Sequence, residues 1–164
     1  MSHPVPGEKQ QKVHGMFKKI MVATDGSQAS IRTAELAVDL ARLSGGSIIA
    51  IYVVDIYRLA HLPGYAAFPS LGSRLMELML REGELAISEV GNMASDEGVP
   101  FDSIIAEGDP SQEIVKRSQK ASADLLVLGR IGRSGLEKIM LGCVAEKVVR
   151  HSKIPVLIVP ALSK

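Results

Sequence analysis

Residues 44–55 read SGGSIIAIYVVD: a Ser-Gly-Gly stop, an almost continuously apolar run over 47–54, and then Asp55. A strand that alternates polar and apolar residues has one solvated face, whereas a continuous β-branched run is typical of a strand covered on both faces. Strands of that kind occur in parallel sheets, where helices cross over both sides. The stretch therefore favours a central strand of a parallel α/β sheet.

The sequence on either side alternates between strand and helix patterns. Apolar residues recur at helical spacing from Ile31 to Leu43 after the capping residue Ser27, and Asp109-Pro110 is a second helix-start signal. The full pattern predicts strands at 17–23, 47–54, 101–107, 125–128 and 155–159, helices at 31–43, 73–97, 110–120 and 142–150, and a loose segment with Pro and Gly at 55–72. This alternation predicts a single doubly wound, five-stranded, mostly parallel α/β sheet with helices on both faces, although several strand orders stay open.

The chain has 164 residues, 46% of them hydrophobic, which fits one domain with one core. Its first fifteen residues are polar, include two Pro and two Gly, and have no periodicity. We therefore expect a flexible N-terminal extension over 1–15 and an α/β domain over 16–164.

Charge and composition narrow the classes of partner. The 19 basic and 18 acidic residues are scattered along the chain, and aromatic residues make up 4% without any Trp, so we expect no nucleic-acid surface. The apolar runs are far shorter than the roughly 20 residues that span a bilayer, so we expect no membrane partner. A single Cys and the lack of a signal-peptide pattern predict a cytoplasmic location.

Ligands of such sheets bind outside the carboxyl ends of the strands. One of these ends, residues 129–143 (GRIGRSGLEKIMLGC), combines four glycines with two arginines. Glycine lets backbone N–H groups converge on an anion, and a helix that starts at Gly142 favours a phosphate. An ordinary flexible connection is the alternative. The Gly-Lys-Ser/Thr of a Walker loop is absent, and so is a Rossmann fingerprint after the first strand.

Together these motifs resemble the universal stress protein family over about 16–160. The resemblance rests on the opening IMVATDGS (20–27), the turn EGDP (107–110), the spacing Gly129-x2-Gly132-x9-Gly142, and the C-terminal segments 144–151 and 154–160. The resemblance implies an ATP-binding subclass, marked by Gly-x2-Gly-x9-Gly followed by Ser or Thr, and a second subclass that lacks the pattern and does not bind ATP. It also implies a homodimer through antiparallel pairing of the last strand, 155–160.

For the site, the resemblance implies ATP, with Mg²⁺ bound through the phosphates. Asp25 would face the ribose or adenine, with a helix cap as its other reading, and backbone near Val53 would read the adenine edge. The remaining residues implied for the site are Ala23, Thr24, Gly129, Arg130, Gly132, Arg133, Gly142, Cys143 and Val144.

Cys143 departs from the family pattern, because it stands where the family has a hydroxyl residue. A thiol is a weak donor, and a hydrogen bond to a charged group contributes about 1.5–3 kcal/mol, so we expect nucleotide binding to be retained but about ten- to a hundredfold weaker. A thiol at a helix N-terminus can also act as a redox-sensitive group. The alternative is a small, half-buried Cys that fills space.

The expected function is that of a cytoplasmic stress-response protein that binds ATP and acts as a nucleotide-dependent dimeric regulator or interaction module. No residue stands out as a base that activates water near the phosphates, so we expect binding with at most weak ATP hydrolysis. The four histidines lack metal-ligand spacing, and we expect no metal site built from side chains. Two alternatives stay open: an interaction protein that binds no nucleotide, and a slow ATP hydrolase on the same scaffold.

Overall fold

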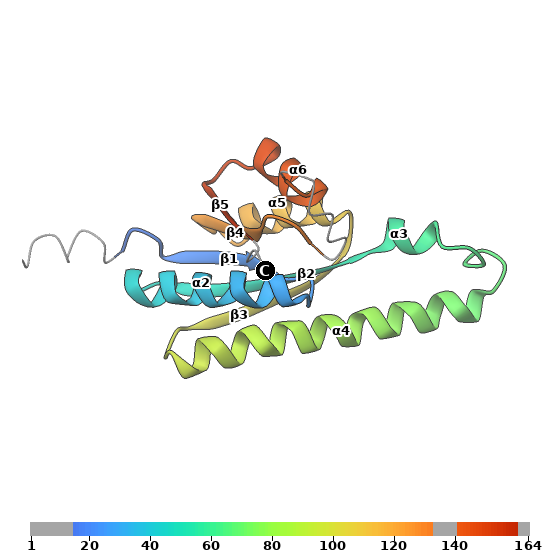
Figure 1. Ribbon diagram of the computed structural model, residues 1–164, viewed down its shortest axis with the longest axis horizontal. Helices are drawn as coiled ribbons and strands as arrows, with labels where there is room; N and C mark the ends of the chain where they lie inside the picture. The colour runs from blue at the N-terminus through green and yellow to red at the C-terminus, as the bar shows by residue number, and fades with distance from the viewer. Residues whose placement is uncertain (1–14, 133–140, 161–164) are drawn as a thin grey trace, which may run out of the picture.

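The computed structural model describes residues 15–132 and 141–160 (Figure 1). The predicted extension over 1–15, except Gly15, and the predicted site residue Arg133 lie outside these ranges. The elements, in chain order, are β1 (Lys19–Ala23), α2 (Gln28–Ser44), β2 (Ser47–Asp55), α3 (Ile56–Ala60), α4 (Pro69–Asp96), β3 (Phe101–Gly108), α5 (Pro110–Lys120), β4 (Leu125–Gly129), α6 (Cys143–His151) and β5 (Val156–Val159).

The five strands form one sheet in the order β3-β2-β1-β4-β5, and every neighbouring pair is parallel. The chain winds outward from β1 through β2 to β3, then crosses back to place β4 on the other side of β1. The predicted α/β fold is confirmed. The strand order reverses between β1 and β4, which is where open α/β sheets bind their ligands.

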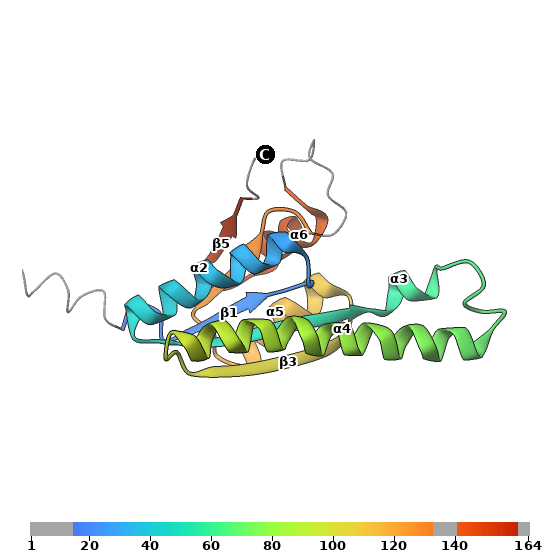
Figure 2. The ribbon, with the colours of Figure 1, turned by 60° about the horizontal axis from the view of Figure 1, so that its bottom comes forward.

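Helices cover both faces of the sheet, and each face has its own core. Alternate residues of β1 show the division: Ile20 and Val22 belong to the cluster under α2 and α4, whereas Met21 belongs to the cluster under α5 and α6. Figures 1 and 2 show α2 and α4 together on one face, with α5 and α6 on the other. Because β2 contributes buried residues to both clusters, its continuously apolar sequence follows from its place inside the sheet.

Two glycines within α4 let aromatic rings of the sheet approach the helix backbone. A Cβ on Gly83 would lie 2.6 Å from Cδ1 of Tyr52, and a Cβ on Gly91 would lie 3.0 Å from Cε1 of Phe101. Glycine in a helix interior costs about 1 kcal/mol relative to Ala. Here the missing methyl group makes room for the rings, so close packing against β2 and β3 explains both glycines.

The segment 55–72 differs from the expected loose connection. Residues 56–60 form helix α3, whose N-cap Asp55 accepts a hydrogen bond at Oδ1 from the N–H of Arg58 (2.9 Å). A single five-residue helix is too short to produce a periodic pattern, so it was missed. Helix α4 also begins at Pro69, four residues before the expected start, with proline in its first turn. In the part of the chain that the structure describes, no helix is long and apolar enough to cross a membrane.

Candidate functional site

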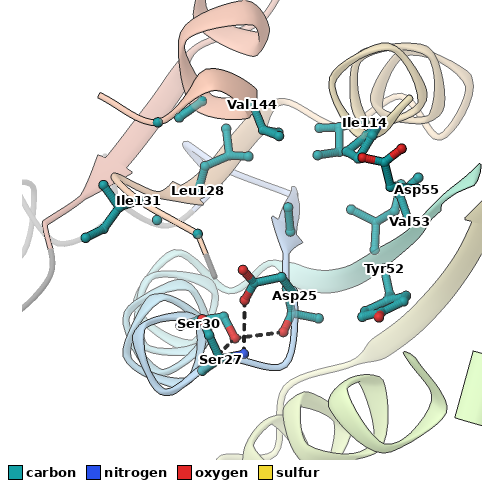
Figure 3. A pocket seen from close by; sticks show the side chains of 18 of the residues that line it. Asp25, Ser27, Ser30, Tyr52, Val53, Asp55, Ile114, Leu128, Ile131 and Val144 are labelled. Carbon is teal, nitrogen blue, oxygen red and sulfur yellow. Dashed lines mark hydrogen bonds between the residues drawn. The ribbon is translucent and has the colours of Figure 1, made fainter. Parts of the chain in front are cut away.

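A pocket of about 410 Å³ lies at the carboxyl ends of β1, β2 and β4, beside the first turns of α5 and α6 (Figure 3). All the predicted site residues that the structure describes line this one pocket: Ala23, Thr24, Asp25, Val53, Gly129, Arg130, Gly132, Gly142, Cys143 and Val144. They come from four segments that are distant in sequence. The parallel sheet brings these segments together because it gathers its strand ends at one edge.

The turn after β1 is held by its own side chains. Asp25 Oδ1 accepts a hydrogen bond from the N–H of Ser27 (3.0 Å), and Thr24 Oγ1 accepts one from the N–H of Gly26 (3.2 Å). Ser27 is the N-cap of α2, and its Oγ accepts from the N–H of Ser30 (3.3 Å). The predicted cap at Ser27 is confirmed, and Asp25 fixes the turn before the helix instead of capping it.

Backbone groups of Val53 face the space beyond the end of β1. Ile48 donates its N–H to the carbonyl of Pro100 beside β3 (2.9 Å), whereas the carbonyl of Ile51 accepts from Thr24 on the β1 side (3.0 Å). Successive residues of a parallel strand turn their N–H and C=O groups to opposite neighbours. Val53, two residues past Ile51, therefore directs both groups toward β1, which has already ended. One backbone donor and one acceptor thus border the pocket.

Three glycines of the loop after β4 lie where an added Cβ would be in tight contact with a neighbouring atom. A Cβ on Gly129 would lie 3.3 Å from Oγ1 of Thr33, one on Gly132 would lie 3.0 Å from Oδ2 of Asp25, and one on Gly142 would lie 3.2 Å from the carbonyl oxygen of Arg130. None of these three glycines has a left-handed φ, and Gly142 has φ −67°. Close approach of neighbouring atoms, and not a positive φ, therefore accounts for glycine at these three positions.

Backbone hydrogen bonds hold the two ends of this loop. Arg130 donates its N–H to the carbonyl of Val159 on β5 (2.8 Å), and its own carbonyl accepts from the N–H of Gly142 (2.8 Å). The start of α6 is thereby fixed against the end of β4. Gly142 is the N-cap of α6 and supplies no side chain, so the first-turn N–H groups of α6 receive no side-chain cap from this residue and can donate to a ligand.

Arg130 and Cys143 bring polar atoms to this end of the pocket. Nε of Arg130 is buried and has no hydrogen-bond partner among the described residues. Cys143, the first residue of α6, lines the pocket with an exposed side chain. The alternative of a half-buried, space-filling cysteine is therefore wrong.

Near the pocket, the start of α5 carries two carboxyl groups whose pKa values are lowered. Burial raises the pKa of Asp109, but hydrogen bonds from Ser111 Oγ and the N–H of Gln112, with the charge of Lys147, outweigh it and hold the pKa below its ordinary value. A hydrogen bond from Arg117 lowers the pKa of Glu113. The predicted N-cap Asp109 and the predicted start of the helix at Pro110 are confirmed.

Ile114, Leu128 and Asp55 are among the lining residues that were not predicted from the sequence. Ile114 and Leu128 form an apolar wall opposite Asp25 together with the predicted Val53 and Val144, and Asp55 lies at the rim beside Ile114 (Figure 3). Asp55 had a signal, since it follows the buried run of β2. Ile114 had none, because only the packing of α5 on the sheet brings its side chain to the pocket. Among the residues that the structure describes, no three His, Cys, Asp or Glu side chains gather to hold a metal ion.

Comparisons with known proteins agree on one family. Residues 16–160 match the model of the universal stress protein family. The sequence is 39% identical over 144 residues to the universal stress protein MJ0531 of Methanocaldococcus jannaschii, covering 88% of this chain and 82% of that protein.

Two solved structures extend the comparison to the fold. The structure of MJ0577, a universal stress protein of the same organism, has a TM-score of 0.79 at 26% identity and covers 91% of this chain and 99% of that one. A universal stress protein in complex with cAMP has a TM-score of 0.61 at 27% identity, over 88% of this chain and 97% of that one.

Proposed function

This chain belongs to the universal stress protein family, and we propose that it binds an adenine nucleotide, ATP in particular, in the pocket at the carboxyl edge of its sheet. One observation carries the proposal: three glycines where an added Cβ would be in tight contact, and a helix N-terminus without a side-chain cap from its N-cap residue, meet at one end of the pocket. The volume of about 410 Å³ is in the range of small-molecule sites. The related protein that was solved with cAMP supports an adenine nucleotide as the ligand.

The phosphates would lie at the glycine end. Gly129, Gly132 and Gly142 let the backbone approach phosphate oxygens, and the N-terminus of α6 adds first-turn N–H groups, which Gly142 does not cap, and a favourable dipole. The buried Nε of Arg130, which has no partner among the described residues, would gain a charge-assisted hydrogen bond. Mg²⁺ would be held by the phosphate oxygens.

The base and ribose would lie at the other end. The N–H and C=O of Val53 offer one donor and one acceptor, which suits the N1 and the 6-amino group of adenine. The apolar side chains of Ile114 and Leu128 would cover the base. Asp25, whose carboxylate lies between the turn after β1 and the glycine loop, would accept a ribose hydroxyl.

The bound nucleotide would act as a signal, with the protein as a dimeric regulator or interaction module. β5 is an edge strand that pairs only with β4 in the described sheet. The carbonyls of Pro155 and Val159 accept hydrogen bonds from the β4 side. Successive residues of a strand direct their N–H and C=O groups to opposite sides, so those of Val156 and Ile158 point away from β4, toward the open edge of the sheet. Those groups would pair with β5 of a second copy in a cytoplasmic homodimer.

Calorimetric titration of the nucleotide-stripped protein with ATP and Mg²⁺ tests the proposal. Saturable binding with one nucleotide per chain is expected, and GTP as a control should bind more weakly because guanine reverses the donor and acceptor at the edge that Val53 would read. Release of phosphate during the titration would make the protein a hydrolase. The absence of any binding heat, confirmed by an unchanged melting temperature with ATP, would leave an interaction protein that binds no nucleotide.

A further inference from the structure

Residues 56–76 form an arm that projects beyond the sheet: α3 leads out, a turn reverses the chain, and the first part of α4 leads back (Figures 1 and 2). Backbone hydrogen bonds order its tip, with Tyr65 donating to the carbonyl of Leu62 (3.1 Å) and Phe68 donating to that of Gly64 (3.0 Å). The Tyr65 ring packs on Gly72, where a Cβ would lie 2.9 Å from Cε2. Hydrogen bonds and side-chain packing therefore give the tip a defined conformation.

Large apolar side chains are exposed on this arm. Tyr57 is 59% exposed, Phe68 63%, and Leu62 and Leu71 each 40%. The ordered backbone holds these four side chains in water, where their exposure is unfavourable. A cluster of this kind marks a contact surface.

The charged residues of the arm indicate the kind of surface that it binds. The arm carries Arg58 and Arg74 and no Asp or Glu, and the fifteen residues between the two arginines are uncharged when His61 is neutral. The next charged residues outward are Asp55 and Glu77, each three positions beyond an arginine. The charges nearest in sequence to the apolar tip are therefore both positive.

We propose that the tip of this arm docks on an anionic lipid surface. Exposed aromatic and aliphatic side chains at a projecting tip can enter the interfacial layer of a bilayer, while the flanking arginines keep their guanidinium groups at the negative headgroups. The contact is peripheral and requires no spanning helix. It goes beyond the sequence-based expectation of no membrane partner, which rested only on the shortness of the apolar runs.

Sedimentation with vesicles tests the proposal on the full chain. The probes are vesicles of phosphatidylcholine mixed with phosphatidylglycerol, compared with phosphatidylcholine alone. The wild type is expected to sediment with the anionic vesicles at low salt and to be released at high salt, because the arginine contribution is screened. Arg74→Gln should weaken the vesicle affinity about fivefold, which corresponds to about 1 kcal/mol for one basic residue at the headgroups.

The double variant Phe68→Ser with Leu71→Ser removes two of the four exposed apolar side chains of the arm. It should fold, because both side chains are exposed and Ser is a favourable residue at position 68, the N-cap of α4. We expect it to stay in solution with either vesicle. Leu85→Ser is the matched control: this leucine is 73% exposed on the same helix but lies outside the arm, and its replacement should leave vesicle binding unchanged.

Three outcomes of the vesicle experiment would overturn the proposal. They are no sedimentation of the wild type with anionic vesicles, undiminished binding in the double variant, and equal loss of binding in Leu85→Ser. Sedimentation velocity without lipid provides a further test. A concentration-dependent dimer that the double variant abolishes would assign the tip to a second copy of this chain, against the proposal.

Discussion

Oδ2 of Asp25 lies 3.0 Å from the position that a Cβ would occupy on Gly132, although one residue follows β1 and the other follows β4. The two loops meet because β1 and β4 are neighbours in the sheet, where the strand order reverses. The proposed site for the ribose and the proposed site for the phosphates are therefore joined at this contact.

Substitution of Gly132 by Ala tests the contact. The added methyl group would press on the carboxylate and shift either Asp25 or the loop, so we expect ATP affinity to fall by about tenfold, or roughly 1.4 kcal/mol. Calorimetric titration measures the change. Gly91→Ala is the matched control, since its Cβ would also lie 3.0 Å from a neighbour, the ring of Phe101, but far from the pocket. Unchanged affinity in Gly132→Ala would contradict the tight contact.

Cys143→Ser should tighten ATP binding. The hydroxyl group is a better donor than the thiol, and a hydrogen bond to a charged phosphate oxygen contributes about 1.5–3 kcal/mol, which predicts about a ten- to hundredfold gain. Cys143→Ala separates this effect from side-chain size and should bind about as tightly as the wild type. Equal affinities in the Ser and Ala variants would mean that residue 143 does not contact the phosphates.

The sequence could predict most of the fold because strand and helix patterns alternate and the caps at Ser27 and Asp109 mark helix starts. Helix α3 was missed because five residues show no period. The strand order stayed open, because the sequence carries no signal for which strands are neighbours, and the structure supplies it.

Some residues of the candidate site could likewise be predicted from the sequence, and others could not. Val53 and Gly142 were found because they stand at ends of predicted elements, and the sheet then brings them to one pocket. The wall residue Ile114 and the unpartnered Nε of Arg130 depend on tertiary packing, which no local pattern encodes. The exposure of Cys143 is likewise a property of the folded chain.

Gly83→Ala should destabilise the fold. The new Cβ would lie 2.6 Å from Cδ1 of the buried Tyr52, and overpacking of this kind costs about 1–3 kcal/mol, which exceeds the gain of about 1 kcal/mol from helix propensity. Urea unfolding gives the change in the free energy of unfolding. Ser88→Ala, on an exposed position of α4, is the control and should be neutral or slightly stabilising. A Gly83→Ala variant more stable than the wild type would contradict the packing explanation.

Stability should fall in acid partly through Asp109. Its pKa is lowered in the folded chain from the ordinary value of 3.8, so its stabilising contribution is present above that value and is lost as the pH falls through the folded pKa. Asp109→Asn should reduce this part of the pH dependence. Urea unfolding at a series of pH values measures it, and identical pH profiles for the two proteins would be the contrary result.

Ile158→Pro should turn the proposed homodimer into a monomer. Proline removes the N–H that the free edge of β5 presents, while the bonds to β4 come from Leu157 and Val159. Ile158→Ala keeps the N–H and should stay dimeric. Sedimentation velocity distinguishes the two, and the same association state in both variants would argue against pairing through this edge.

The central claim is that a nucleotide binds with its phosphates on the glycine loop and its base at β2. Amide resonances in a ¹⁵N–¹H spectrum report on both ends of the pocket when ATP and Mg²⁺ are added. We predict saturable shifts of the N–H groups of Gly132, Cys143 and Val53, with those of Phe101 and Asp102 at the start of β3 unchanged. Unshifted Gly132 and Val53 amides at saturating ATP would contradict the account.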